Sequence, residues 1–491
     1  MRRILTVALA ATAVAAAAVP AVSMAAPPAS TTKKLPSTVK WAPCPPDVVQ
    51  YVPLECAKLD VPLDYRKPEG RQIEIALSRL ASKDPSQRRG ILLTNPGGPG
   101  VTGVDYPGLL ARAGTSKDVL NAYDLVGFDP RGVGRSTPVS CDLTPAQQLR
   151  GAFAKYAHSA ADVTREAAYA QTIAKQCTTS KTASMLPHIT TANTARDMDR
   201  IREALGEPKA SFLGASYGSY LGAVHTTLFP RTSDRVVIDS VLGPQGYDVN
   251  AMRGFGRGLE DRFPDFAAFV VAHPEYGLGK TPQQVKAKFF ELARKLRAKP
   301  VEGMNETDFR AAAFGFLYGD ATMPTLAKLW QDLDTGRPVT VPPATDNNTT
   351  MSARLHVICN DSRWPASVRE YQRNVLVDRI KYPMLGAASA NIGPCAFWPK
   401  QRIEPPVKIT GRGPSNVLLV QNERDPGTPL AGAQKMRRAL GDRATMVTVD
   451  GGGHGVYPFS KNTCGKNAVT TYLVTGERPA QDIACAAEPK K

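Results

Sequence analysis

The stretch Gly214-Ala215-Ser216-Tyr217-Gly218 decides the fold of this chain. An apolar run at residues 210–213 precedes it and predicts a strand, and the segment that follows, as far as Phe229-Pro230, predicts a helix. A strand, a sharp turn and a helix around a G-x-S-x-G sequence form a nucleophile elbow, whose strained turn exposes the serine hydroxyl at the top of a sheet. We therefore expect Ser216 to attack a carbonyl group, provided that a histidine base and a carboxylate lie beside it.

Apolar runs on both sides of this stretch predict an α/β fold. A helix near residues 194–205 has Met198, Ile201 and Leu205 on one face. Strands that alternate with helices are typical of a mostly parallel sheet with helices on both faces. Besides the strand before Ser216, we expect strands at residues 73–80, 90–95, 124–129, 235–239, 416–420 and 446–449.

A long insertion separates two of these strands. Residues 240–415 contain no convincing strand, although a parallel crossover needs only about a dozen residues. Thr281, followed by Pro282, predicts the start of a helix. We therefore predict an inserted helical cap, or lid, over residues 245–405. The apolar stripe of its first clear helix consists of Val285, Phe289, Leu292 and Leu296.

Two further strand ends carry the partners that Ser216 needs. Asp425 follows the strand at 416–420 on a turn with proline and glycine, and His454 follows the last strand amid four glycines. The order serine, aspartate, histidine is that of the α/β-hydrolase triad. We predict that His454 transfers the proton of Ser216, and that Asp425 orients the imidazole and stabilises its cation. Asp239, which ends another strand, is the alternative acid.

A glycine-rich loop, Asn95-Pro96-Gly97-Gly98-Pro99-Gly100, follows the strand at 90–95. Acyl transfer needs preorganised backbone donors for the developing oxyanion. We predict that these donors are the amide of Tyr217, the residue after the nucleophile, and an amide of this loop, with Gly98 favoured over Gly97. The prolines have no N–H group to donate. A phosphate-binding loop is the alternative, but this loop lacks the Lys-Ser/Thr ending of a P-loop. A second glycine-rich segment, residues 129–136, predicts a structural turn beside the active site.

The N-terminus has the pattern of an export signal. A basic start at residues 1–3 precedes an almost wholly apolar run at 4–22, and small residues at 23–26 offer a cleavage site. We predict a cleavable signal peptide at 1–26, with an uncleaved membrane anchor as the alternative. A flexible leader is predicted at 27–38.

The mature chain is then predicted to be an α/β-hydrolase core interrupted by the cap. The two parts of the core are expected at residues 39–244 and 406–491, on either side of the cap at 245–405. We expect this protein to be secreted, without a stable membrane anchor, and a monomer is compatible with the sequence.

Eight cysteines in an exported chain predict disulfide bonds. Pairing between sequence neighbours is favoured, although other connectivities remain formally open. No pair has the C-x-x-C spacing of a zinc site, and we expect neither a metal nor a cofactor. The favoured pairs are Cys44–Cys56, Cys141–Cys177, Cys359–Cys395 and Cys464–Cys485.

The formal net charge of +17 is spread along the chain rather than gathered in one run. A nucleic-acid-binding protein would cluster basic residues and interleave them with aromatic ones, so we expect no nucleic-acid partner. The charge fits a basic exported protein that associates with anionic cell-wall polymers.

On these motifs the chain resembles the secreted tripeptidyl aminopeptidases of actinobacteria, which are related to the proline iminopeptidases among the α/β hydrolases. The resemblance spans nearly the whole mature chain, and residues 402–485 resemble the characteristic C-terminal module of that family. It implies Ser216, Asp425 and His454 as the triad, and the release of short peptides, often tripeptides, from free N-termini of peptides or proteins. Some relatives prefer proline before the cut, and others act as esterases. The segments that carry the resemblance are residues 95–100, 129–136, 214–218, 359–361, 395–399, 425–429 and 453–455.

The chain departs from the family pattern at Gly427, where many relatives have a small aliphatic residue. An exopeptidase also needs a negative group for the substrate's α-ammonium, which in proline iminopeptidases comes from the cap. Glu260, Asp261 and Asp265 are the candidates here, although acids on a cap helix commonly face only water. The leading hypothesis is a secreted serine exopeptidase. The alternatives are a secreted carboxylesterase with the same triad and a catalytically inactive binding protein.

Overall fold

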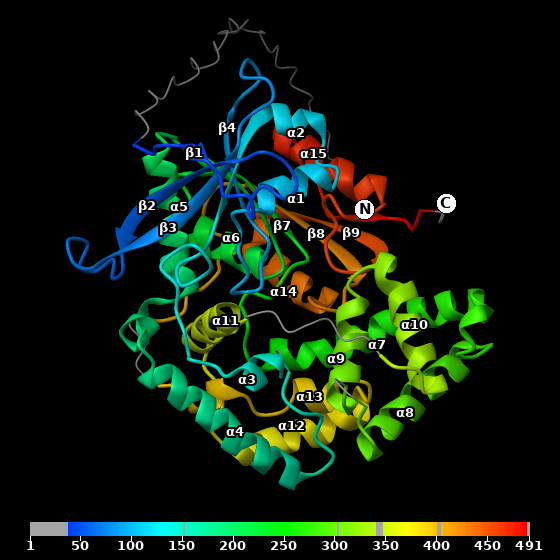
Figure 1. The fold of residues 1–491 in the computed structure, drawn as a ribbon. Coiled ribbons are helices and arrows are strands. Elements are labelled where there is room, and N and C mark those ends of the chain that lie inside the picture. Colours follow the sequence, from blue (N-terminus) through cyan, green and yellow to red (C-terminus); the bar gives the residue numbers. More distant parts are fainter. Residues whose placement is uncertain (1–37, 151–152, 302–303, 340–346, 400–403, 489–491) are drawn as a thin grey trace, which may run out of the picture. The chain divides into compact units, whose positions relative to one another are not determined.

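A ten-stranded sheet forms the centre of the fold (Figure 1). The computed structural model describes residues 38–150, 153–301, 304–339, 347–399 and 404–488. The predicted signal peptide at 1–26 lies outside these residues, as does the predicted leader as far as residue 37. In the described part of the chain, no helix is both long enough and apolar enough to cross a membrane.

The sheet has the strand order β1-β2-β3-β5-β4-β6-β7-β8-β9-β10. All neighbours from β5 to β10 pair in parallel, whereas β1, β2 and β3 form an antiparallel edge. This order and the parallel centre confirm the predicted α/β-hydrolase fold. The strands are β1 (Ala42–Pro43), β2 (Glu55–Pro62), β3 (Gln72–Leu80), β4 (Gly90–Asn95), β5 (Tyr123–Phe128), β6 (Ala210–Ala215), β7 (Ser233–Asp239), β8 (Val417–Arg424), β9 (Ala444–Gly452) and β10 (Ile483–Cys485).

Helices cover both faces of the sheet, as predicted (Figure 1). Successive strand residues point to opposite faces, so in β6 Phe212 packs into one hydrophobic cluster and Leu213 into the other. The Phe212 cluster includes apolar residues of α5 (Thr191–Ala204), α6 (Tyr217–Leu228) and α14 (Leu430–Leu440). The Leu213 cluster includes those of α1 (Tyr106–Arg112), α2 (Lys117–Ala122) and α15 (Thr463–Thr475).

The predicted insertion between β7 and β8 is helical. Thr281 caps one of its helices by accepting a hydrogen bond from the Gln284 amide, and the predicted apolar stripe of this helix is buried. The helices are α7 (Val249–Ala272), α8 (Pro282–Ala298), α9 (Glu306–Phe316), α10 (Met323–Thr335), α11 (Asn348–Asp361), α12 (Val368–Lys381) and α13 (Gly386–Ser389). Short 3-10 turns are η1 (Ala183–His188), η2 (Pro274–Tyr276), η3 (Asp320–Thr322), η4 (Pro394–Phe397) and η5 (Gly441–Arg443).

A second helical segment precedes the nucleophile and differs from the predicted division at 39–244. It contains α3 (Pro145–Leu149) and α4 (Ala160–Thr179), and α4 packs against α12 and η4 rather than against the sheet (Figure 1). The buried face of α4 combines three alanines and Glu166 with only a few larger apolar residues, among them Val163 and Ile173. Such a face gives a weak periodic signal in the sequence, which explains why this helix was not expected. We refer to α3, α4 and α7–α13 as the cap helices.

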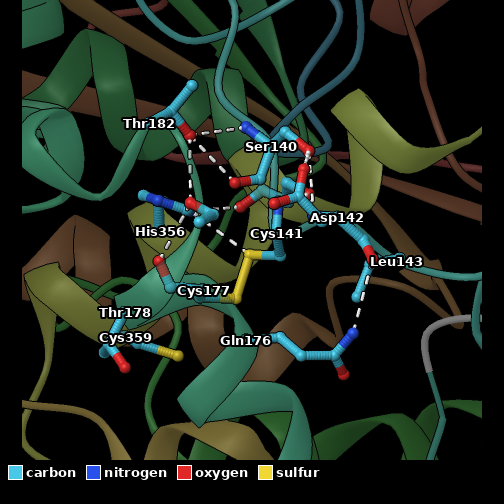
Figure 2. Close-up of a disulfide and its surroundings, with 12 residues drawn as sticks. Ser140, Cys141, Asp142, Leu143, Gln176, Cys177, Thr178, Thr182, His356 and Cys359 are labelled. Carbon is cyan, nitrogen blue, oxygen red and sulfur yellow. Dashed lines mark hydrogen bonds between the residues drawn. A yellow bond between two sulfur atoms is a disulfide. The ribbon is translucent and has the colours of Figure 1, made fainter.

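Four disulfide bonds join the eight cysteines in the predicted pairs. Figure 2 shows the bond between Cys141 and Cys177, which attaches the segment after β5 to α4. The Cys141 amide donates to Ser352 Oγ at 2.8 Å, and Cys141 Sγ lies 4.0 Å from His356 Nδ1. Ser352 and His356 belong to α11, so this bond also anchors a cap helix.

Candidate active site

Ser216 occupies the sharp turn between β6 and α6. Its φ of 60° and ψ of −125° are strained for a residue with a side chain. The flanking glycines are needed because their neighbours approach closely. A Cβ atom at Gly214 would lie 2.5 Å from the Gly218 carbonyl oxygen, and one at Gly218 would lie 2.6 Å from the Asn95 carbonyl oxygen. The strand, turn and helix predicted around Ser216 are therefore all present.

His454 and Asp425 form a hydrogen-bonded pair at the neighbouring strand ends. His454 Nδ1 lies 2.9 Å from Asp425 Oδ1 and 3.0 Å from Oδ2. The carboxylate is buried and also accepts hydrogen bonds from the amides of Gly427 and Thr428 and from Thr428 Oγ1. These donors fix the carboxylate. Nε2 forms no hydrogen bond within the described residues, so this ring nitrogen is free to exchange a proton.

The surroundings of His454 favour its protonated form. Burial alone would lower the pKa of the imidazole, but the charge and hydrogen bond of Asp425, with a smaller contribution from Asp239, raise it above the usual value of 6.5. A base with this pKa accepts a proton readily near neutral pH. The pair can therefore deprotonate a serine and return the proton to a leaving group.

Asp239 connects the serine turn to the histidine loop. Its carbonyl oxygen accepts the Ser216 amide at 3.0 Å, and its carboxylate accepts the amides of Val456 at 2.9 Å and Tyr457 at 2.6 Å. Complete burial raises the pKa of this carboxyl group to about 6. Asp239 was the alternative acid, but it contacts the backbone after His454, whereas Asp425 contacts the imidazole ring.

The glycine-rich loop lies directly against the nucleophile. A Cβ atom at Gly97 would lie 2.8 Å from Ser216 Cβ and 3.1 Å from the Tyr217 amide nitrogen. The Gly97 amide already donates to Asn95 Oδ1 at 3.0 Å. This bond favours Gly98 over Gly97 as the loop donor. Tyr217 begins α6, and the first amides of a helix have no intrahelical acceptor, so its N–H group is also suited to an oxyanion.

The segment at 129–136 is the structural turn that its glycines predicted. The Asp129 carboxylate accepts the amides of Gly103, Val104 and Arg135 at 2.8, 3.1 and 2.7 Å. It therefore fixes the chain that follows the glycine-rich loop.

Three residues of the insertion contact the site, and sequence reasoning identified none of them. The Tyr318 ring packs on the His454 ring with centroids 4.7 Å apart, and the Tyr318 carbonyl accepts the His454 amide at 2.7 Å. Arg354 Nη1 donates to the Gly98 carbonyl at 3.0 Å, and its guanidinium lies 5.3 Å from the ring centroid of Tyr247.

Tyr247 itself adjoins the nucleophile. Burial raises the pKa of its phenol, and the charge of Arg354 and hydrogen bonding by the Ser216 and Arg354 side chains oppose that rise. No periodic pattern in the sequence distinguishes Tyr247, Arg354 or Tyr318, because each is selected by a tertiary contact.

The three acids predicted to bind an α-ammonium group already have basic partners. Glu260 pairs with Lys286 at 3.0 Å and accepts the Met384 amide at 3.0 Å. The partner of Asp261 is Arg257, at 3.1 Å. Asp265 pairs with Arg262 and with Arg424. These contacts neutralise the carboxylates on α7.

A serine on a strained turn, with a bonded histidine–aspartate pair at the carboxyl end of a parallel sheet, defines a serine hydrolase of the α/β-hydrolase fold. A family model described as "TAP-like protein" matches residues 382–485. The tripeptidyl aminopeptidase of Streptomyces lividans is 35% identical over 473 residues, which cover 91% of this chain and 86% of the relative. The chain belongs to the tripeptidyl aminopeptidase family, and the protein is a serine peptidase.

Two further relatives come from Mycobacterium tuberculosis. Serine protease Hip1 is 29% identical, with 92% of each chain covered. Carboxylesterase B is 30% identical, and the match covers 88% of this chain and 86% of the relative. The family around this chain thus includes proteins named as peptidases and one named as an esterase.

Proposed function

We propose that this protein is a secreted serine exopeptidase that releases short peptides, most simply tripeptides, from free N-termini. The observation that carries this proposal is the His454–Asp425 pair at 2.9 Å beside the strained Ser216 turn, in a chain 35% identical to a tripeptidyl aminopeptidase. The predicted signal peptide at 1–26 and the four disulfide bonds support secretion.

The proposed reaction proceeds through an acyl-enzyme. The Ser216 oxygen attacks the scissile carbonyl carbon while His454 Nε2 takes the serine proton. The amides of Tyr217 and Gly98 donate to the oxyanion, and Asp425 stabilises the imidazolium. His454 then gives the proton to the leaving amine as the C–N bond breaks. Water repeats the sequence on the ester, releasing the short peptide and restoring the serine.

The group that binds the substrate's α-ammonium is a separate part of the proposal. Of the three predicted acids, Asp265 has a contact with the start of the histidine loop, because a Cβ atom at Gly452 would lie 2.4 Å from its Oδ2. Glu260 and Asp261 remain candidates on the same helix. A substrate amine would have to compete with the lysine or arginine partner of each carboxylate.

A secreted carboxylesterase is the second candidate, supported by the 30% identity to carboxylesterase B. The two functions are separated by the rates with a tripeptide p-nitroanilide, its N-acetylated form and p-nitrophenyl butyrate. The exopeptidase proposal predicts that acetylation abolishes anilide cleavage. Fast butyrate turnover with no effect of acetylation would favour the esterase.

A further inference from the structure

A cavity of about 120 Å³ lies among the cap helices. It is bounded by residues of α3, α4, α7, α11, α12 and α13. Two of its lining residues, Arg354 and Val249, connect it to the active site. Arg354 donates to the Gly98 carbonyl of the glycine-rich loop, and Val249 follows Tyr247, which adjoins Ser216, by two positions. The cavity therefore lies beside the glycine-rich loop, which is predicted to supply an oxyanion donor.

The walls of the cavity are mainly apolar and aromatic, with Phe153, Tyr169, Met252, Met351 and Trp364 among them. Apolar walls with a few convergent polar groups are typical of sites for small organic groups.

The charged groups in the walls are Arg150, Glu166 and Arg354, and each already has a partner. Glu166 forms an ion pair with Arg150, whose guanidinium lies 3.6 Å from the ring centroid of Tyr169. Burial raises the pKa of Glu166, against the opposing effect of Arg150. Arg354 is engaged with Gly98 and the Tyr247 ring. A positively charged side chain that entered this cavity would find Glu166 already paired, and a negatively charged one would have to draw Arg354 away from Gly98.

One buried polar group in the wall has no partner. Tyr371 is only 2% exposed, and its hydroxyl forms no hydrogen bond within the described residues. Leaving such a group unpaired is unfavourable, so a ligand that bonds to it gains affinity. A peptide brings carbonyl and amide groups that could satisfy it, whereas a purely hydrocarbon ligand brings none.

We propose that this cavity binds an uncharged, apolar side chain of the N-terminal segment that the enzyme releases. The inference rests on the proposed exopeptidase function. An exopeptidase leaves a long polypeptide on the C-terminal side of the cut, and that part must extend into open space. A cavity of about 120 Å³ has room for one side chain of the short N-terminal segment but not for a long polypeptide. The mainly apolar, aromatic walls therefore select the side chain at one position of that segment.

Gly393 offers a way to fill the cavity without disturbing its walls. It lines the cavity, its φ is −125°, and an added Cβ atom would meet no atom within 4 Å. The test measures kcat/KM for tripeptide p-nitroanilides in which Ala, Leu, Phe, Lys and Asp are varied at each of the three positions. At one position the wild type should prefer Leu or Phe to Lys or Asp, and Gly393→Met should lower the rates for Leu and Phe there about tenfold, leaving Ala nearly unchanged.

The matched control is Gly315→Met. Gly315 is exposed on α9, and an added Cβ atom there would also meet no atom within 4 Å. The substrate profile of this control should equal that of the wild type. Met351→Ala enlarges the cavity and provides a second variant, in which the Phe-to-Ala rate ratio should rise at least about threefold. Active variants whose profiles all equal the wild-type profile would overturn the cavity assignment alone. A wild type that cleaves no free-amine tripeptide would overturn the exopeptidase proposal, and this inference with it.

Discussion

Three residues fix His454 and the loop that carries it, and each contact has a different effect. Asp425 binds Nδ1, so Nε2 lies on the side of the ring away from the carboxylate. Tyr318 packs against the ring and accepts the backbone amide, so it fixes the position of the loop. Asp239 binds the two amides that follow. The proton-transfer geometry thus depends on residues from the core and from the insertion.

Asp425→Asn should reduce kcat/KM about 10⁴-fold, because the amide neither stabilises the imidazolium nor fixes its tautomer. The pH profile supplies a second readout. His454 acts as a base only when neutral, so the wild-type rate should rise with pH through a midpoint above 6.5, the usual value that Asp425 raises. In the variant, burial dominates and the midpoint should move to lower pH. Asp442→Asn, at an exposed position of η5, is the control. An unchanged midpoint in Asp425→Asn would contradict this account of the pair.

Among the cap helices, α11 contacts the glycine-rich loop of the active site. Arg354 holds the Gly98 carbonyl, and a Cβ atom at Gly100 would lie 2.3 Å from the Thr350 carbonyl oxygen. Ser352 bonds the Cys141 amide, and Cys359 is linked to Cys395 of η4. A cap helix therefore supports the loop that supplies an oxyanion donor.

Arg354→Met should lower kcat about tenfold and change KM little, because a misplaced loop donor weakens an interaction made mainly in the transition state. Steady-state kinetics on a tripeptide p-nitroanilide measure both parameters. Arg373→Met, at an exposed position of α12, is the matched control. If kcat is unchanged and only KM rises, Arg354 acts on substrate binding alone and does not position the loop.

Across the whole molecule, disulfide bonds hold the helical segments together. The Cys141–Cys177 bond closes a separation of 36 residues around α3 and α4, and Cys359–Cys395 closes 36 residues around α12 and α13. The Cys44–Cys56 bond closes only 12 residues at the antiparallel edge of the sheet. Long closed loops remove more conformational entropy from the unfolded chain.

The double variant Cys141→Ala/Cys177→Ala should lower the free energy of unfolding by about 4 kcal/mol on the chain-entropy estimate, and Cys44→Ala/Cys56→Ala by about 3 kcal/mol. Denaturant titrations measure both losses. The first variant should also lose activity at denaturant concentrations at which its far-UV circular dichroism is still largely intact, because α11 is anchored near Cys141. Coincident losses would show that this bond has no local effect on the cap.

The strands of the sheet and the residues at their ends could be predicted from the sequence. One helix and the residues of the insertion that contact the active site could not. Strongly apolar runs such as 90–95 and 416–420 became β4 and β8 because buried parallel strands have a clear signal. The helix at 160–179 was not predicted, since its buried face mixes small alanines with Glu166 and so forms no strong apolar stripe. Tyr318 and Arg354 could not be found either, because their roles arise from contacts between distant segments.

Covalent labelling of the nucleophile tests the central claim most directly. A fluorophosphonate probe should modify the purified enzyme once, on the peptide that contains Ser216, and hydrolysis of a free-amine tripeptide p-nitroanilide should fall in proportion to labelling. Ser216→Ala should neither take the label nor cleave the substrate. Modification of another residue, or full activity in Ser216→Ala, would contradict the claim that His454 and Asp425 activate this serine.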